Sequence, residues 1–342
     1  METTISHPTY GTRSAPAGVA AGSPLTRIHG PAAALALVHD ELDAAEQALR
    51  GLLHTDVAAV PAVGGYLASA GGKRLRPALT ALGCLAAGFD RPRTRLLCVG
   101  ELIHLGSLLH DDVVDEGGMR RGKPAAHRVF GNAVTVLTGD FCLARAVLLA
   151  AEEGGHDAVT ALARAVTEMA EGEVLQLGHC GDLSTTRAEY LDIVNRKSAA
   201  LIAWCVAAGA LAQGDHPTAR ALERFGRGAG VAFQISDDTL DYSLETGKTM
   251  GADLRERKIT LPLLFALSTD SELAAELADG PPAAERIPAL ADRVRRSGAL
   301  DLARAEARAR AEEAVSALDP LPPSLGRDAL AELGRYLADR AS

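Results

Sequence analysis

Two acidic segments of the chain repeat one spacing of aspartates. Residues 110–116 read HDDVVDE and residues 236–242 read SDDTLDY, and both contain the pattern D-D-x-x-D. Side chains four residues apart share one face of a helix, so the first and last aspartates of each pattern lie side by side, with the middle one about 100° away. We define the first cluster as Asp111, Asp112 and Asp115, and the second cluster as Asp237, Asp238 and Asp241.

Carboxylates paired in this way predict a site for a divalent cation. Like charges four residues apart destabilise a helix, and Gly117 and Gly118 follow the first cluster, so its carboxylates also oppose the dipole of a helix end. A single D-D-x-x-D is more often a solvated helix end, but the second copy favours metal binding. Mg²⁺ takes one or two carboxylates and completes its shell with water and substrate phosphates. The predicted ligands are Asp111, Asp115, Asp237 and Asp241.

Basic residues follow both clusters, and acid followed by base is the arrangement expected for a metal together with a phosphate group. A third basic group lies in a glycine-led loop, where guanidinium groups and backbone N–H groups can bind a second phosphate. The basic residues are Arg120 and Arg121 after the first cluster, Lys248 and Lys258 after the second, and Lys73, Arg74 and Arg76 in the loop GGKRLRP.

Each cluster also ends a stripe of small and polar residues on one helix face. The other faces of the first helix are mostly leucine, isoleucine and valine, so we expect the stripe to line a cleft. The first stripe contains Gly100, His104, Ser107, Asp111 and Asp115, and the second contains Gly230, Gln234, Asp237 and Asp241. Two helices would then face each other across a pocket for metal and phosphate, with apolar walls below.

The elements that must position these residues are helices. Aromatic residues make up only 4% of the 342 residues, β-branched runs are scarce, and apolar residues recur every three to four positions from about residue 31 onward. Short breakers interrupt this pattern. The sequence predicts an all-α protein with a flexible N-terminal tail over residues 1–29 and a single domain over residues 30–342.

Charge, cysteines and apolar segments narrow the class of protein. The formal net charge of −9 argues against a nucleic-acid binder. The five cysteines are scattered without C-x-x-C spacing, and the N-terminus lacks a secretory signal, which indicates a reduced, cytoplasmic protein. The longest apolar stretch, residues 198–212, is shorter than the roughly 20 residues that span a bilayer, so we expect no transmembrane segment.

With these motifs in this order, the chain resembles a trans-polyprenyl diphosphate synthase of the isoprenoid synthase family. The resemblance runs from about residue 65 to residue 265. It implies a helical bundle around a deep central cavity, a homodimer and a magnesium-dependent prenyltransferase. The matching segments are GGKRLRP, ELIHLGSLLHDDVVDE with RRGKPAAH, LTGDFCLARA, EGEVLQL, RKSAALI, FQISDDTLDY and GKTMGADLRERKITLPLL.

The resemblance also implies roles for individual residues. Both aspartate clusters and Lys197 would be catalytic, with about three Mg²⁺ ions bridging the clusters and the diphosphate of an allylic substrate. The residues implied to contact that diphosphate are Arg120, Lys197, Ser198, Gln234, Lys248 and Lys258. Those implied to bind isopentenyl diphosphate are Lys73, Arg76, His104 and Arg121. The implied reaction ionises the allylic C–O bond, joins the isopentenyl double bond to the allylic cation and releases a proton.

The sequence departs from the family pattern near the second cluster. Ser198 stands where threonine is usual, which keeps the hydroxyl. Arg257 replaces the glycine before Lys258, and Thr249 replaces a frequent proline. The loop after the second cluster is also a few residues short. These changes affect the expected placement of the two lysines that follow this cluster.

Product length depends on what blocks the tunnel below the first cluster. In the family, bulky aromatics at the fifth and fourth positions before the cluster stop the chain early, and here these positions are Gly106 and Ser107. Gly100, along the same stripe, leaves another turn of about 5.4 Å open. We therefore expect an all-trans product of about 30 to 50 carbons.

Three alternatives stay open. A short-chain synthase would make farnesyl or geranylgeranyl diphosphate. A terpene cyclase typically pairs one aspartate cluster with a second cluster of another type, which the intact second cluster disfavours. A non-catalytic synthase subunit would be expected to have lost aspartates, and none is missing from either cluster.

Overall fold

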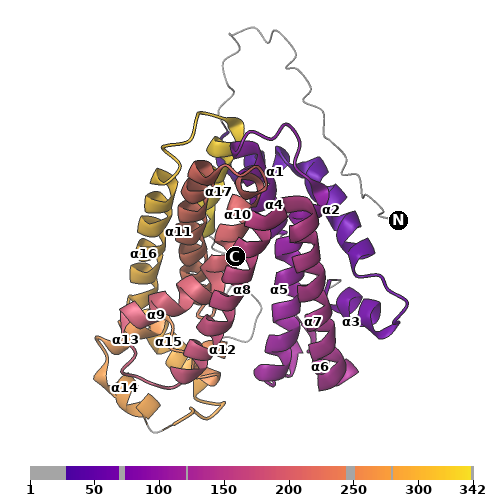
Figure 1. Ribbon diagram of the computed structural model, residues 1–342. Helices are drawn as coiled ribbons and strands as arrows, with labels where there is room; N and C mark the ends of the chain where they lie inside the picture. Colours follow the sequence, from indigo (N-terminus) through magenta and orange to yellow (C-terminus); the bar gives the residue numbers. More distant parts are fainter. Residues whose placement is uncertain (1–27, 69–73, 121, 244–250, 279, 340–342) are drawn as a thin grey trace, which may run out of the picture.

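The chain folds into a bundle of helices (Figure 1). The structure is a computed structural model, and it describes residues 28–68, 74–120, 122–243, 251–278 and 280–339. The prediction of an all-α fold is confirmed, because regular structure in these ranges is helical apart from one two-stranded hairpin. Lys73, Arg121 and Lys248, three of the residues expected to bind diphosphates, lie outside the described residues.

The first half of the chain forms the side of the bundle on which α5 and α7 lie against each other (Figure 1). The two strands follow the first cluster directly, with Met119 paired to Pro124. The elements are α1 (Gly30–Ala36), α2 (His39–Leu52), α3 (Ala59–Ala68), α4 (Leu75–Ala86), α5 (Thr94–Val114), β1 (Met119–Arg120), β2 (Lys123–Pro124), α6 (Ala126–Phe130), α7 (Asn132–Leu149), the π-helix η1 (Ala150–Gly154) and α8 (Gly155–Gly178).

The second half forms the opposite side, where α11, α16 and α17 pack together (Figure 1). The elements are α9 (Arg187–Val194), the π-helix η2 (Asn195–Ala199), α10 (Ala200–Ala212), α11 (His216–Leu240), α12 (Ala252–Arg255), α13 (Leu261–Leu267), α14 (Ser271–Ala278), α15 (Ile287–Arg296), α16 (Ala299–Ser316) and α17 (Leu325–Ala338).

The core is centred on α10, in which residues 200–210 are all buried. A helix that is apolar on every side must be surrounded by protein, and α10 contacts α4, α5, α8 and α11. Small residues bring these helices close together. A Cβ atom at Gly226 of α11 would lie 2.5 Å from Cα of Ala203, and one at Gly83 of α4 would overlap the carbonyl oxygen of Val206. The walls around the site are therefore held by close backbone packing.

Capping side chains set where α9 and α11 begin. The hydroxyl of Thr186 accepts the backbone N–H of Glu189 at 3.2 Å, and the Glu189 carboxylate accepts the N–H of Thr186 at 2.7 Å. Asp215 accepts the N–H of Thr218 at 3.2 Å at the start of α11. Such caps stabilise helix termini by satisfying otherwise unpaired N–H groups. They fix the starts of the two helical segments that carry Lys197 and the second cluster.

An apolar hairpin was not anticipated from the sequence. Residues 132–178 form a helical run that is long and apolar enough to cross a membrane by length and composition. Of its most apolar stretch, 39% is buried inside the protein. Gly155, with φ +72°, interrupts this run, which folds back as α7 and α8 (Figure 1). Among the large apolar side chains exposed on the hairpin are Leu137, Val174 and Leu177. The run is therefore two shorter helices of the bundle with an apolar outer face.

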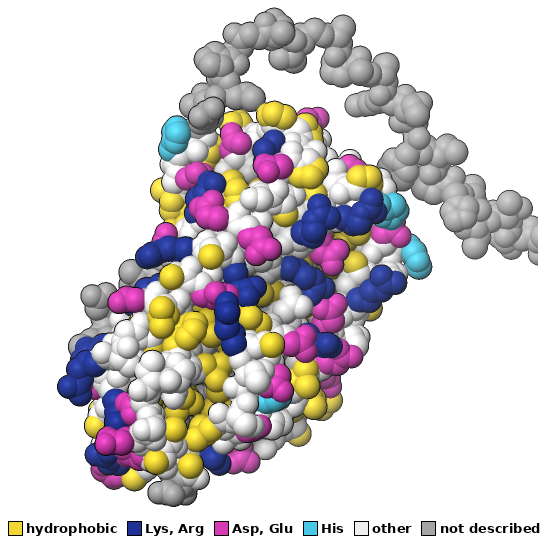
Figure 2. Space-filling model, turned by 90° about the vertical axis from the view of Figure 1, so that its left-hand side faces the viewer, with side chains coloured by type: hydrophobic (Ala, Val, Ile, Leu, Met, Phe, Trp, Pro, Cys, Tyr) yellow, Lys and Arg dark blue, Asp and Glu magenta, His cyan; other side chains and the backbone are white. Residues whose placement is uncertain are grey.

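The face that carries α16 has a different surface. Figure 2 shows acidic and basic side chains interspersed there, with hydrophobic side chains gathered between them. The buried side of α16 is a row of alanines at 303, 307, 311 and 314. A surface of mixed charge is typical of an outer helix exposed to water.

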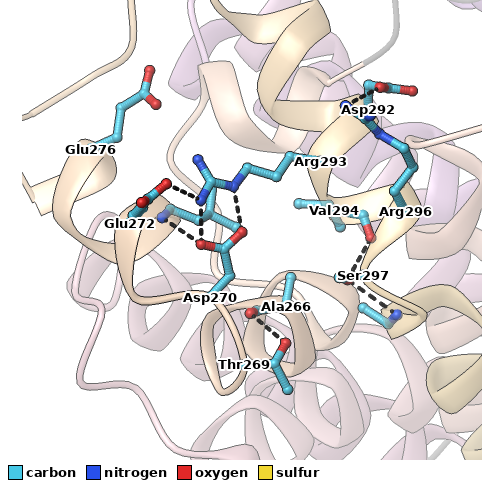
Figure 3. A network of polar contacts seen from close by, with 12 residues as sticks. Ala266, Thr269, Asp270, Glu272, Glu276, Asp292, Arg293, Val294, Arg296 and Ser297 are labelled. Atoms are coloured by element: carbon cyan, nitrogen blue, oxygen red, sulfur yellow. Dashed lines mark hydrogen bonds and ion pairs between the residues drawn. The ribbon is translucent and has the colours of Figure 1, made fainter.

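A separate polar network ties α14 to α15. Asp270 accepts the N–H of Leu273 at 2.9 Å and pairs with Arg293, which also donates to Glu272 at 3.0 Å (Figure 3). The hydrogen bond from Arg293 is the main reason why the pKa of Asp270 lies below its usual range. None of these four residues lines the cavity that contains the second cluster, so we assign the network a structural role.

Candidate active site

The first cluster lies at the end of α5, and the contacts of its middle aspartate are to other parts of the protein. Asp112 is 2% exposed, pairs with the guanidinium of Arg120 in β1, and accepts the backbone N–H of Ala126 at 2.9 Å. It therefore fastens the loop after the cluster to α5. Asp111 and Asp115, one turn apart, are the members left to meet a ligand.

The second cluster ends α11, and its middle aspartate is also held. Asp238 is 8% exposed; it accepts the hydroxyl of Tyr190 at 2.6 Å and the side-chain amide of Gln234 at 2.8 Å. Asp237, one residue earlier, is exposed and lines the cavity. The two neighbouring aspartates thus differ in task, because one is held by the protein and the other faces the open space.

The last aspartate of the second cluster caps a helix. The two oxygens of Asp241 accept the backbone N–H groups of Ala252 and Asp253 at 2.9 and 3.0 Å, at the start of α12. An anionic side chain at a helix N-terminus is stabilised by the helix dipole. Asp241 therefore anchors the segment that continues to Lys258.

A cavity of about 1080 Å³ lies in front of the second cluster. Glycines of the loop after the first cluster contribute to its wall, so segments that follow α5 and α11 meet here. Among its lining residues are Gly117, Gly118, Lys197, Ser198, Gln234, Asp237, Asp238, Asp241 and Lys258. The cavity therefore brings the second cluster together with Lys197 and Lys258, whereas no aspartate of the first cluster is among its described lining residues.

Two lysines that line this cavity pair with carboxylates around it. Lys197 lies in η2 and pairs with Glu173 of α8. Lys258, which follows the second cluster in sequence, lies 3.7 Å from a carboxylate oxygen of Asp115 and 2.6 Å from Glu256. Burial lowers the pKa of Lys258, but these carboxylates outweigh it and the net shift is upward. Both lysines line the cavity. Lys197 lies in a π-helical turn, and such turns often mark functional sites.

Burial raises the pKa of Asp111 in the first cluster and of Asp238 and Asp241 in the second. For Asp111, burial is the largest cause and Glu173 adds to it, while Lys197 opposes it, so that its pKa is about 6. For Asp238, burial outweighs the hydrogen bonds from Tyr190 and Gln234 and raises the pKa to about 7. Carboxylates held at such a cost are expected where a cation binds.

The carboxylates fit magnesium with help from other ligands. Among the described residues, no three His, Cys, Asp or Glu side chains converge closely enough to hold an ion by themselves. Mg²⁺ commonly binds one or two carboxylates and fills its shell with water and phosphate oxygens. The pair Asp111 and Asp115 and the exposed Asp237 suit that coordination, in which water and phosphate oxygens would supply the remaining ligands.

The expectation that both stripes line a cleft is wrong for their glycines. A Cβ atom at Gly100 would overlap the sulfur of Cys205, and one at Gly230 would lie 2.7 Å from Cα of Ala199. Both glycines allow close packing of α5 and α11 against the segment formed by η2 and α10. These small residues provide contact between helices, so Gly100 leaves no turn open for a product.

Gly106 also has a packing partner. A Cβ atom there would lie 3.0 Å from the carbonyl oxygen of Gly139 and 3.4 Å from Cβ of Cys142, both in α7. Its small size is explained by the contact between α5 and α7. Ser107, whose hydroxyl donates to the carbonyl of His104 at 3.0 Å, is half-buried and belongs to the Asp111 face of α5.

Two expected isopentenyl diphosphate ligands lie on neighbouring helices. Arg76 is in the first turn of α4, and its Cβ would be 3.5 Å from a Cβ at Gly100. His104 is one turn further along α5. Neither is among the residues that line the 1080 Å³ cavity. Arg74, in contrast, bridges Glu46 at 2.6 Å and Glu101 at 2.7 Å, which joins α2, α4 and α5.

The unusual Arg257 adopts a backbone conformation that favours glycine. Its φ is +56°, which explains why glycine suits this position. The Gly181 N–H donates to the carbonyl of Arg257 at 2.8 Å, and the guanidinium covers Gly181 so closely that a Cβ there would overlap it. Arg257 thus joins the loop after α8 to the segment that carries Lys258.

Sequence reasoning missed three residues of this site. Glu173 lies in the segment EGEVLQL, whose pattern indicates no role for it, and Tyr190 precedes Lys197 by two helical turns. Asp253 is half-buried beside Asp238 and Asp241, and its pKa is raised well above the usual range, chiefly by burial. Their partners are distant in sequence, so spacing alone carried no signal for them.

Comparison with known proteins agrees with this geometry. The family model described as Polyprenyl synthetase matches residues 58–290. Octaprenyl diphosphate synthase of Haemophilus influenzae is 37% identical over 89% of this chain and 95% of the relative. Heptaprenyl diphosphate synthase component 2 of Geobacillus stearothermophilus is 34% identical over 88% of this chain and 96% of the relative.

A solved structure shares the fold along most of the chain. The polyprenyl synthase of Caulobacter crescentus, described as complexed with calcium and isoprenyl diphosphate, has a TM-score of 0.85 and 38% identity, and the match covers 90% of this chain and 97% of that one. The aspartate clusters, the cavity and these likenesses agree, and the chain belongs to the polyprenyl synthetase family.

Proposed function

We propose that this protein is a prenyltransferase that condenses isopentenyl diphosphate with an allylic diphosphate, such as farnesyl or geranylgeranyl diphosphate. The products are a medium- or long-chain all-trans polyprenyl diphosphate and pyrophosphate. One observation carries the proposal: Asp237 and Lys258 line one cavity, and Lys258 also reaches Asp115 of the first cluster. Relatives named octaprenyl and heptaprenyl diphosphate synthase support the longer products.

The residues around the cavity suit the loss of a diphosphate. We propose that Asp111, Asp115 and Asp237 hold magnesium, with Asp241 contributing through its remaining lone pairs. When bound, magnesium would supply positive charge to the departing diphosphate. Lys197 and Lys258 are placed to stabilise the negative charge that develops as the C–O bond breaks, and electrostatic stabilisation of this kind often contributes most to catalysis.

The other expected contacts remain part of the proposal. Ser198, Gln234, Arg120 and Lys248 would complete the allylic diphosphate site. Lys73, Arg76, His104 and Arg121 would bind isopentenyl diphosphate. The isopentenyl double bond attacks the allylic cation, a new C–C bond forms, and the proton lost from the adjacent carbon passes to the departing pyrophosphate. The step requires no side-chain nucleophile.

A product assay tests the proposal. The purified chain is incubated with Mg²⁺, farnesyl diphosphate and labelled isopentenyl diphosphate, and both pyrophosphate and the prenyl products are measured. We expect pyrophosphate release and products longer than geranylgeranyl diphosphate, with Asp237→Ala as the inactive control. Farnesyl or geranylgeranyl diphosphate as sole product would identify a short-chain synthase, cyclic hydrocarbons a terpene cyclase, and no pyrophosphate release a non-catalytic subunit.

We propose that two copies associate through the outer face of α7 and α8. Leu137, in the first half of α7, is 66% exposed, and Val174, near the end of α8, is 69% exposed. Large exposed apolar patches usually mark interfaces, and one patch on both copies forms a two-fold interface. Sedimentation should give a dimer that Val174→Asp weakens. Leu302→Asp, which changes a 53% exposed leucine on α16, should leave the dimer intact.

We also propose that the protein works in the cytoplasm as one domain from residue 30 onward. The five cysteines are unpaired, and four of them are buried, as expected in a reducing compartment. Fractionation of cells that make the protein, with blotting of the soluble and membrane fractions, tests the location.

A further inference from the structure

A chain of hydrogen bonds connects three elements behind the cavity. The hydroxyl of Tyr190 in α9 donates to Asp238 in α11 at 2.6 Å, and the Gln234 amide donates to the other oxygen of Asp238 at 2.8 Å. The hydroxyl of Ser198 in η2 donates to the amide oxygen of Gln234 at 2.7 Å. Tyr190 is 3% exposed and Asp238 is 8% exposed, so water has little access to the start of the chain.

The direction of every hydrogen bond in this chain follows from the carboxylate of Asp238. In its ionised form the carboxylate of Asp238 accepts the Tyr190 hydroxyl at one oxygen and the Gln234 N–H at the other. The amide of Gln234 must then present its oxygen to Ser198, whose hydroxyl hydrogen is used there. One N–H of Gln234 and the lone pairs of Ser198 remain for the cavity, which both residues line.

Asp238 depends on neutral donors. Among the described residues no lysine or arginine pairs with its carboxylate. The nearby carboxylates of Asp237 and Asp241 raise the pKa of Asp238, and Asp238 in turn raises the pKa of Asp253. The loss of one donor from a buried carboxylate is costly because the desolvated charge stays behind. Without the Tyr190 hydroxyl, the side chain of Asp238 would have to turn toward another partner.

We propose that Tyr190 is a positioning residue for the prenyl transfer: through Asp238, Gln234 and Ser198 it fixes the end of α11 and η2 relative to each other. Asp237, which precedes Asp238, and Lys197, which precedes Ser198, then face the cavity in a set arrangement before substrate binds. The proposal rests on the function proposed above, because it concerns the same cavity. Tyr190 itself acts through Asp238.

The substitution Tyr190→Phe removes one oxygen and keeps the ring that fills the core. Partners that orient metal ligands typically change metal affinity or activity by about 10- to 100-fold when they are removed. We expect kcat to fall by about that factor and the Mg²⁺ concentration for half-maximal activity to rise, while the KM for isopentenyl diphosphate stays within about twofold. Tyr336→Phe, a hydroxyl deletion in α17, is the matched control.

Three outcomes separate the explanations. If the wild type is active and folded Tyr190→Phe shows the same kcat and Mg²⁺ requirement, the inference is overturned. The proposed function then still stands. A loss of activity that follows only the thermal unfolding of the variant, with no change in Mg²⁺ requirement, also overturns it. An inactive wild type, by contrast, refutes the proposed function itself.

A second variant covers the other end of the chain. Ser198→Ala should raise the Mg²⁺ requirement as well, and the double variant with Tyr190→Phe should lose less than the product of the two single losses, because both act through one chain. Multiplicative losses contradict the inference. If Tyr190→Phe does not fold, an unchanged Mg²⁺ requirement in Ser198→Ala contradicts it instead.

Discussion

The two aspartate clusters share one pattern and differ in how the protein holds them. In the first, the middle aspartate, Asp112, meets the cationic Arg120 and a backbone N–H. In the second, the described residues that hydrogen-bond to Asp238 are the neutral donors Tyr190 and Gln234. The same D-D-x-x-D pattern therefore contains a middle carboxylate held by an ion pair in the first cluster and one held by neutral hydrogen-bond donors in the second.

The last aspartates of the clusters differ in the same sense. Asp115 lies 3.7 Å from Lys258 across the cavity, whereas the oxygens of Asp241 accept two backbone N–H groups that start α12. Asp115 can exchange its contact with Lys258 for another ligand, whereas Asp241 is held by its hydrogen bonds to the backbone of α12. The motif predicts which residues gather, and the loops that follow decide what each of them does.

Asp237→Ala and Asp241→Ala test the division of tasks within the second cluster. Removal of a group that stabilises developing charge lowers kcat by roughly 10²- to 10³-fold, and we expect this for Asp237→Ala with little change in stability. Asp241→Ala should also lower the free energy of unfolding by about 1 kcal/mol, because α12 loses its cap. Steady-state kinetics and urea denaturation measure both, and equal stabilities would show that the cap contributes nothing.

Arg120→Ala and Tyr190→Phe compare the two ways of holding the middle aspartates. Removing one partner of a buried ion pair costs about 3–5 kcal/mol. Because Arg120 is partly exposed, we expect the loss for Arg120→Ala to lie near the lower end of that range. Losing a neutral donor to a buried carboxylate costs about 1–3 kcal/mol. Urea denaturation without Mg²⁺ should rank Arg120→Ala as the more destabilised, and the opposite order would refute the comparison.

The pH dependence of stability should separate Asp238 from other groups. Its pKa is about 7 in the folded protein against 3.8 for an ordinary aspartate, so between these values the folded state binds a proton that the unfolded chain has released. The free energy of unfolding should therefore fall as pH rises from about 4 to about 7. Asp111, with a pKa of about 6, contributes to the same slope up to about that pH. In Mg²⁺-free urea titrations Asp238→Asn should therefore reduce the slope, most clearly near pH 7, whereas an unchanged slope places the proton elsewhere.

Ser107→Phe and Gly106→Ala extend the comparison to the helix face before the first cluster. We expect Ser107→Phe to shorten the prenyl product with a small effect on the rate of the first condensation. Gly106→Ala should instead cost stability, because the added methyl group meets Gly139 of α7 and overpacking costs about 1–3 kcal/mol. Product chromatography and thermal unfolding separate these effects, and a shortened product from Gly106→Ala alone would reverse the assignment.

Much of this arrangement follows from the sequence because helix periodicity is local. The all-α fold depends on alanine and leucine at helical spacing, and the clusters stand out because carboxylates rarely gather at helix ends without a reason. The prediction for the glycines of the two stripes was wrong for a physical cause. A small residue on a helix face suits both a cleft and a neighbouring helix, and only the position of Cys205 or Ala199 decides between them.

Tyr190 could not be found from spacing. Its partner Asp238 is 48 residues further along the chain, and the contact forms only when α9 packs beside α11. Lys258 is a similar case, since nothing in its neighbourhood in the sequence points to Asp115, on the opposite cluster. Contacts of this kind depend on how helices are placed against one another, which composition and periodicity leave undetermined.

The close packing around α10 has a consequence for the energetics of folding. Alanine and glycine have no rotamer freedom to lose, so ordering this part of the core costs less side-chain entropy than ordering leucines would. Each small side chain also offers little surface to be withdrawn from water. The centre of the bundle is thus held by many weak contacts at fixed backbone distances, and a single added methyl group, as at Gly226, has no side chain to push aside and must displace a helix.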